Sequence, residues 1–92
     1  MRATYLVCYD IADERRLARV YSEIKSWGLH LQLSVFLCRL TWPELVELKA
    51  ALTELINEAE DDVRIYPLPS GGEVVVLGRG DRVPEGVSLY LS

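Results

Sequence analysis

Hydrophobic and polar residues recur along the chain with two different periods, and each period predicts one type of element. Residues 3–9 are rich in Thr, Tyr, Leu, Val and Cys, which predicts a buried strand that ends before Asp10. Over residues 14–27, apolar side chains recur every three or four positions, which predicts a helix with one apolar face. We expect Gly28 to end this helix.

The next part of the chain repeats the order of strand and helix. Residues 29–40 place an apolar side chain at every second position, a period typical of a strand. At about 3.3 Å per residue this segment would extend roughly 40 Å, so we expect a bend or bulge near Gln32 to Ser34 to divide it into two strands. Thr41 followed by Glu44 predicts a capping box at the start of a second helix, whose apolar face comprises Leu45, Leu48, Leu52, Leu55 and Ile56.

The segment after the second helix combines acidic residues with further strand patterns. Glu58, Glu60, Asp61 and Asp62 predict a solvated turn. Residues 63–68 alternate again, but Pro67 lacks a backbone donor, so this fourth strand is expected at a sheet edge. The valine-rich residues 73–78 predict an additional strand, and the apolar residues 87–91 allow another.

The order strand, helix, strand, strand, helix, strand is typical of the α+β class and of the ferredoxin-like βαββαβ fold. In that fold an antiparallel sheet carries both helices on one face, and the other face is left bare. The 92 residues predict a single domain near the small end of what folds with one core. Because a bare sheet face and an extra C-terminal strand need a partner, we expect a symmetric homodimer.

Composition limits the classes of function. Half of the residues are hydrophobic and 26% are charged, as in an ordinary globular protein and unlike a disordered one. The net charge of -4 argues against a broad basic surface, so any nucleic-acid site must be local. The apolar run before Asp10 is far too short to span a membrane, so we expect a cytoplasmic protein without membrane contact. Cys8 and Cys38 lie in apolar stretches, where a buried thiol is the usual outcome.

Asp10 is the first candidate for chemistry, because it ends a strand directly before a helix. A carboxylate there is held rigidly and still reaches the surface, although an aspartate at this position is also an ordinary helix-start residue. If two copies associate around an axis near the first strand, their Asp10 carboxylates would approach each other and require a proton or a metal. Mg²⁺ suits such a site, since it binds through one or two carboxylates and retained waters.

Three arginines on the first helix are candidates for binding phosphates. Arg19 follows Arg16 by three positions and Arg15 by four, which allows one cationic strip. Pairing of these arginines with Glu14 and Glu23 on the helix surface is an equally good interpretation.

Three residues of the long alternating segment have polar or aromatic side chains of interest. His30 could donate a proton or contact a phosphate, and its interpretation as an ordinary strand surface residue is the alternative. Ser34 lacks the GxSxG context of a hydrolase nucleophile. Phe36 is by default a core or interface residue.

The chain resembles the CRISPR-associated Cas2 family over nearly its whole length, in the segments YLVCYDIADERR, GLHLQLSVFLCRL, DDVRIYPL and EVVVLGRG. The strongest matches are Tyr9 with Asp10, Gln32 with residues 34–36, and residues 64–66. The resemblance implies a ferredoxin-like homodimer in which the two Asp10 carboxylates share Mg²⁺ or Mn²⁺. It also implies that residues 73–92 form an exchange strand and tail, with the strand extending the partner's sheet.

The resemblance further implies an activity and partners. Members of the family form a complex with the Cas1 integrase and help to hold the DNA fragment that becomes a new spacer. Some act as metal-dependent endonucleases on RNA or DNA. By position, the implied nuclease site comprises Tyr9, Asp10, Arg19, Ser34 and Phe36. His30 stands where members often have arginine, which replaces a permanent charge by a titrating one.

Several functions therefore remain open at this point. In the first, a metal between two Asp10 side chains activates water while Arg19 and its neighbours bind the phosphates of RNA or DNA. In the second, which we favour for immunity, the dimer is a non-catalytic scaffold that holds duplex DNA in the integrase complex. A VapD-like toxin ribonuclease and a regulatory small-molecule module on the same fold are alternatives.

Overall fold

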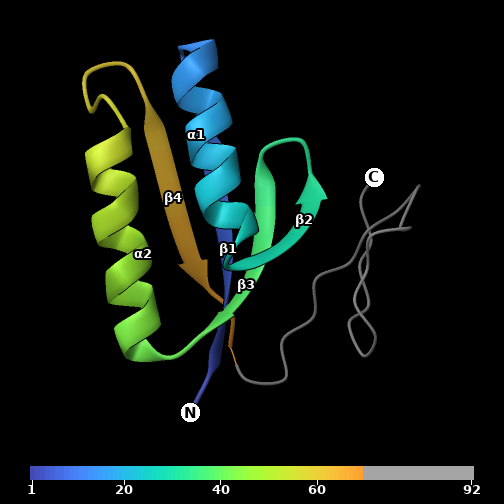
Figure 1. Ribbon diagram of the computed structural model, residues 1–92. Coiled ribbons are helices and arrows are strands. Elements are labelled where there is room, and N and C mark those ends of the chain that lie inside the picture. The colour runs from blue at the N-terminus through green and yellow to red at the C-terminus, as the bar shows by residue number, and fades with distance from the viewer. Residues whose placement is uncertain (70–92) are drawn as a thin grey trace.

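The computed structural model describes residues 1–69, and their elements follow the predicted order (Figure 1). They are β1 (Ala3–Asp10), α1 (Glu14–Lys25), β2 (Gly28–Gln32), β3 (Val35–Leu40), α2 (Trp42–Leu55) and β4 (Asp62–Pro67). The strands form one antiparallel sheet in the order β2-β3-β1-β4, and both helices lie on the same face of it. The α+β class and the ferredoxin-like arrangement are confirmed, and within residues 1–69 β4 lies at an edge of the sheet, as expected. The strands and tail predicted within residues 73–92 lie outside the described residues.

A tight hairpin divides the long alternating segment in two. β2 ends at Gln32 and β3 begins at Val35, and the register shifts between His30 and Gln32, so the predicted bend is confirmed. The end of β1 holds this turn in place. The backbone amide of Tyr9 donates to the Ser34 carbonyl at 3.1 Å, and the Tyr9 hydroxyl donates to the Leu33 carbonyl at 3.2 Å.

The core lies between the sheet and the two helices. Its fully buried side chains come from every one of these layers: Val7, Val20, Ile24, Phe36, Cys38 and Leu48. The apolar stripes predicted for the helices supply this core, because residues three and four apart share one helix face. At the start of α2 the capping box is present, with the Thr41 hydroxyl accepting from the Glu44 amide and the Glu44 carboxylate accepting from the Thr41 amide. No helix within residues 1–69 has the length and apolar character needed to cross a bilayer.

Gly28 has a different role from the predicted one. The first helix already ends at Lys25, with Ser26 in the right-handed helical region as its C-cap, so no glycine is needed to stop it. Gly28 instead begins β2, where a Cβ atom would collide with the Leu37 carbonyl oxygen and the Cys38 sulfur. The absence of a side chain lets β2 approach β3 closely at this point.

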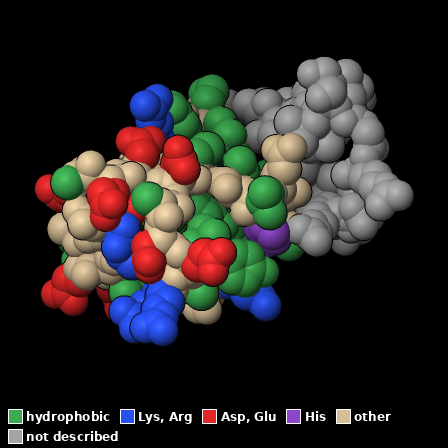
Figure 2. All heavy atoms as spheres, turned by 90° about the horizontal axis from the view of Figure 1, so that it is seen from above, with side chains coloured by type: hydrophobic (Ala, Val, Ile, Leu, Met, Phe, Trp, Pro, Cys, Tyr) green, Lys and Arg blue, Asp and Glu red, His purple; other side chains and the backbone are tan. Residues whose placement is uncertain are grey.

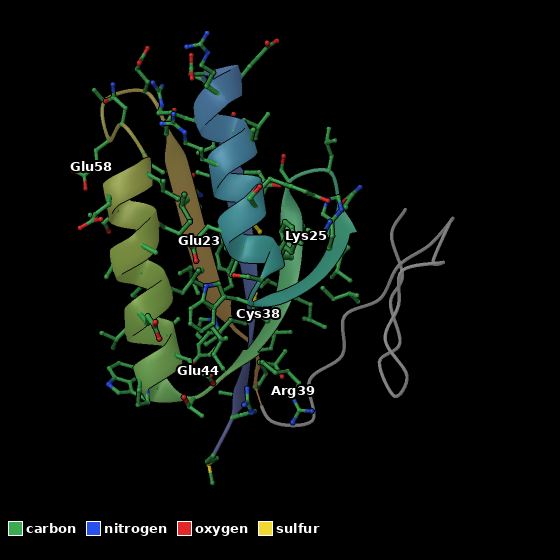
Figure 3. All side chains as sticks on the ribbon, in the orientation of Figure 1. Glu23, Lys25, Cys38, Arg39, Glu44 and Glu58 are labelled. Carbon is green, nitrogen blue, oxygen red and sulfur yellow. The ribbon has the colours of Figure 1, made fainter. Side chains whose placement is uncertain are left out.

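The acidic segment after α2 is not a solvated turn throughout, which corrects the prediction for Asp61. Its carboxylate is fully buried and accepts hydrogen bonds from the backbone amides of Asn57 at 2.8 Å and Ala12 at 2.9 Å. The Arg16 guanidinium completes the set, with its Nε 2.8 Å from Asp61 Oδ2. Asp61 therefore joins the loop before α1, α1 itself and the loop before β4. Glu58, in contrast, is exposed and points outward from its loop (Figure 3).

We predict that Asp61→Asn lowers the melting temperature at neutral pH by about 10 °C, because a charged acceptor with three donors is lost. The Arg16 hydrogen bond and the two amides lower the pKa of the Asp61 carboxyl well below its usual range. Because the pKa of Asp61 is lower in the folded state than in the unfolded state, the ionised carboxylate stabilises the folded protein. This contribution is complete above the unfolded-state pKa of about 3.9 and is lost as the pH falls toward the folded-state pKa. The gap in melting temperature between wild type and variant should therefore narrow below about pH 4. Thermal unfolding followed by circular dichroism from pH 7 to pH 2.5 measures this gap, with Glu58→Gln as the control at an exposed position. Equal melting temperatures of wild type and Asp61→Asn at pH 7 would refute the role of Asp61.

We also predict that Gly28→Ala destabilises the protein by about 1–3 kcal/mol, because the added methyl group overpacks the contact between β2 and β3. Urea denaturation followed by tryptophan fluorescence measures this change. Gln32→Ala, at an exposed position of the same strand, is the matched control. Since alanine is ordinarily better than glycine within a strand, a gain in stability at position 28 would show that the contact is not tight.

Candidate functional site

Tyr9 and Asp10, which the sequence assigns to one site, point to opposite faces of the sheet. Successive side chains of a strand alternate between faces, and Tyr9 is buried with Val7 beneath the helices. Asp10 is exposed on the other face, which no helix of residues 1–69 covers. We call this second face the open face. By alternation and strand register it carries Leu6, Cys8, Asp10, Val35, Leu37, Asp62, Arg64 and Tyr66.

Asp10 has an acidic neighbour on the open face that sequence reasoning did not identify. The register between β1 and β4 places Asp62 directly opposite Asp10. Directly opposed residues of an antiparallel pair lie on the same face with their Cβ atoms about 5 Å apart. Arg64 Nε donates to Asp62 Oδ2 at 2.9 Å, which holds the Asp62 carboxylate on the same face of the sheet as Arg64. The alternation of residues 63–68, extended back by one residue, puts Asp62 on the same face as Arg64 and Tyr66. This pattern was the signal that could have placed Asp62 on the face of Asp10.

Two carboxylates at one end of the sheet suit a hard divalent cation, whose preferred ligands are oxygens. Within the described residues, no group of three or more His, Cys, Asp or Glu side chains is arranged to hold a metal ion. Asp10 and Asp62 thus fit part of a Mg²⁺ or Mn²⁺ site, as the prediction for Asp10 requires. The remaining ligands would be waters, substrate or groups from a second copy.

The predicted arginine strip is only partly available. Arg16 is held by the buried Asp61 and donates to Glu60 at 3.2 Å, so its role is structural and the expected phosphate contact by Arg16 is wrong. Arg15 and Arg19 are exposed one turn apart on the outer side of α1. Glu23, one of the predicted surface partners, accepts a hydrogen bond from the Trp27 indole at 2.8 Å. Arg15 and Arg19 are therefore the arginines that α1 presents to a ligand, and Lys25 at its end lies over the Tyr21 ring at 5.7 Å from the centroid.

The remaining predicted residues gather on the helix side of the sheet. Phe36 is fully buried, and its ring centroid lies 4.8 Å from that of His30 and 5.6 Å from that of Tyr21. His30 is half-buried against Tyr21, with centroids 5.2 Å apart, so its interpretation as an ordinary surface residue is wrong. Ser34 lies in the hairpin turn. The five residues of the implied nuclease site do not converge, because only Asp10 reaches the open face.

Burial limits the acid–base chemistry of Tyr9 and of the two cysteines. Burial raises the pKa of the Tyr9 hydroxyl, and the neighbouring Tyr21 adds to the effect, so Tyr9 stays protonated and acts as a donor. Burial also raises the pKa of the Cys38 thiol to about 11 and that of Cys8 in the same direction, with Arg64 opposing the change at Cys8. A thiolate nucleophile is thereby disfavoured at both positions. The buried thiol expected at Cys38 is confirmed, and Cys8 is half-buried.

Comparison with known proteins identifies relatives of this chain. The family model for CRISPR associated protein Cas2 matches residues 1–73. The CRISPR-associated endoribonuclease Cas2 2 of Thermodesulfovibrio yellowstonii is 58% identical over 90 residues, which span 98% of this chain and 99% of the relative.

Solved structures extend the likeness to the fold. A hypothetical protein from Thermus thermophilus superposes with a TM-score of 0.82 at 39% identity, over 87% of this chain and 95% of that one. Streptococcus pyogenes Cas2 superposes with a TM-score of 0.68 at 36% identity, over 73% of this chain and 87% of that one. Since sequence and fold agree over most of its length, this chain belongs to the CRISPR-associated Cas2 family.

Proposed function

We propose that this chain is a metal-dependent endonuclease of a CRISPR system that works as a homodimer, with Asp10 of each copy at the metal. The observation that carries the proposal is the exposed Asp10 carboxylate at the end of β1, with Asp62 opposite it, on the open face. The relative at 58% identity is named an endoribonuclease, which favours RNA as a substrate. Cleavage of a phosphodiester would then take place at the end of the sheet.

The open face supports the dimer. Between Arg39 at one end and Asp10 at the other, its middle is apolar and comprises Leu6, Cys8, Val35, Leu37 and Tyr66, from three strands. Tyr66 is 46% exposed there although it is a large aromatic residue. An apolar sheet face that no helix of residues 1–69 covers indicates an interface, and a two-fold axis near β1 would bring the two Asp10 side chains together. Because one chain offers two carboxylates there, a second copy would complete the oxygen ligands.

Each of the chain's own groups has a defined task in this mechanism. The Asp10 carboxylates, with Asp62 beside them, would hold Mg²⁺ or Mn²⁺ between the copies. When bound, the cation supplies Lewis-acid stabilisation of the phosphate and lowers the pKa of a bound water. Arg15 and Arg19 bind phosphate oxygens and set the path of the strand. The Tyr9 hydroxyl, which donates to Leu33, holds the hairpin turn against β1 and so is a positioning group.

A scaffold role in spacer acquisition is the second candidate. The observation that favours it is that, within residues 1–69, Arg16 is committed to Asp61 and Arg64 is paired with Asp62, while the net charge of the chain is -4. Arg15 and Arg19 of two copies could grip duplex DNA at separate points without a basic channel. In this role the dimer would associate with a Cas1 integrase and hold the new spacer. The near full-length match to Cas2 relatives speaks against the VapD-like toxin alternative.

We predict that Asp10→Ala lowers cleavage of labelled RNA by about 100-fold or more, because the metal loses its charged ligand. Single-stranded RNA and duplex DNA are each incubated with the purified protein in Mg²⁺, Mn²⁺ or EDTA, and products are resolved on a denaturing gel. Glu58→Gln controls for loss of an exposed acid away from the site, and should cleave like wild type. Activity that survives Asp10→Ala would remove Asp10 from the mechanism.

No cleavage by wild type in either metal would contradict the nuclease proposal and leave the scaffold role. Retention of Cas1 on the immobilised dimer then tests that role.

We further predict that Leu6→Glu converts the dimer to monomer, because it places a charge at the centre of the apolar open face. Sedimentation velocity at micromolar concentrations measures the change. Leu17→Glu, at an exposed apolar position on α1, is the matched control and should leave the dimer intact. A monomeric wild type, or a Leu6→Glu variant that remains dimeric, would contradict an interface on the open face.

A further inference from the structure

A hollow of about 440 Å³ lies on the helix side of the sheet, between α1 and the β2–β3 hairpin. Its walls include Leu17 and Tyr21 of α1, His30 of β2 and Leu33 of the turn. Viewed from above, hydrophobic side chains gather around the single histidine, beside acidic and basic ones (Figure 2). The volume lies within the range of small-molecule sites, and a mostly apolar lining with a few polar groups is also typical of them.

The lining of this hollow favours a flat ring as its occupant. Leu33 is 85% exposed and Leu17 is 38% exposed, so two large apolar side chains stand at its mouth in contact with water. Deeper in, the rings of Tyr21 and His30 are nearly perpendicular, with an interplanar angle of 89°. Two perpendicular aromatic walls form a corner in which a planar ring stacks on one wall and meets the other edge-on. The leucines would then cover the exposed side of that ring.

The surroundings of the hollow favour an anionic group attached to the ring. A second hollow, lined by Arg19, adjoins the first along Ala18 and Ser22 of α1. Arg15 is exposed one helical turn before Arg19. A ligand whose ring entered the first hollow would therefore carry its next substituents past these two guanidinium groups. Guanidinium groups bind phosphate oxygens strongly, so the ligand combines a planar ring with a phosphate.

We propose that this hollow receives one unpaired base of a single-stranded nucleic acid, with the adjoining phosphates on Arg15 and Arg19. The base stacks on Tyr21 or His30, and the Glu14 carboxylate at the rim accepts from an exocyclic amino group of the base. A duplex base is paired and stacked, so it does not enter without being extruded, and single strands are preferred. The inference rests on the proposed function, because it names the nucleic acid that the endonuclease would hold.

The position of the hollow suits that role. Tyr9 lines the hollow on the helix side, while Asp10, the next residue, points to the open face at the same end of the sheet. A strand anchored by one base here passes around the sheet end toward the Asp10 carboxylate. The base is thus held away from the cleaved bond. It adds to the affinity and sets the position of the strand, but it takes no part in the reaction.

Binding of two matched oligonucleotides tests the inference. A fluorescent 12-mer single strand is compared with the same strand in which the bases are replaced by abasic sites, by anisotropy in EDTA so that no cleavage occurs. We expect wild type to bind the base-containing strand about 10-fold more tightly. The double variant Leu17→Ser/Leu33→Ser should lose most of this preference and still bind a duplex of equal length as wild type does. Val46→Ser, at an exposed position on α2, is the control and should keep the preference.

The outcomes separate the inference from the proposed function. Arg15→Ala/Arg19→Ala should weaken both single strands about equally, since it removes phosphate contacts only. An unchanged base preference in the leucine double variant would overturn the inference, whatever the nuclease assay shows. If that variant instead loses retention of a protein partner such as Cas1 with nucleic-acid binding intact, the hollow serves a protein side chain and the inference is wrong. A base preference that depends on the leucines in a protein without nuclease activity would support the inference and reject only the proposed chemistry.

Discussion

The buried carboxylate of Asp61 is the constraint on which the functional end of the molecule depends. It takes hydrogen bonds from Ala12, Arg16 and Asn57, so the loop before α1, α1 itself and the loop before β4 cannot move independently. Asp62 follows it directly in the chain and begins the strand that places a second carboxylate opposite Asp10. The buried carboxylate of Asp61 therefore holds in place the segments that carry the exposed carboxylates of Asp10 and Asp62. The same contact explains why Arg16 is unavailable to a ligand, since a buried anion must keep its cation.

The alternation of β1 distributes two kinds of chemistry between the faces of one sheet. Tyr9 turns toward the helices and holds the hairpin turn, and with it the aromatic hollow. Asp10 turns toward the open face, where apolar strand residues lead up to the acidic pair. In the proposed dimer, metal chemistry would lie between the copies, while each copy would keep its own base-binding hollow outside. A one-residue slip of β1 would exchange these faces, so the core packing of Val7 also sets the register of the site.

The sequence predicts those parts of the structure that depend on local patterns. The apolar stripes give both helices, the capping box of Thr41 and Glu44 gives the start of α2, and Pro67 gives the edge strand, because each signal lies within a few residues of its consequence. Contacts across the chain are not predictable in this way. The acidic run appears solvated until Arg16, 45 residues away from Asp61, is known to be its partner. The sequence around Gly28 predicts a helix stop, and only the close approach of β3 to Gly28 reveals its actual role. Tyr9 and Asp10 are a different case: the resemblance assigned them to one site, although the alternation of a strand already turns neighbouring side chains to opposite faces.

The engagement of Arg16 within residues 1–69 shapes how this molecule would hold nucleic acid. With Arg16 engaged, α1 presents Arg15, Arg19 and Lys25, and an overall negative charge supplies little attraction at a distance. Few phosphate contacts give weak binding by themselves, so affinity has to come from another source. Stacking of a base in the hollow provides a contact that salt screens little. A two-fold dimer doubles both kinds of contact on one rigid body, so a strand that engages both copies would bind far more tightly than either copy alone.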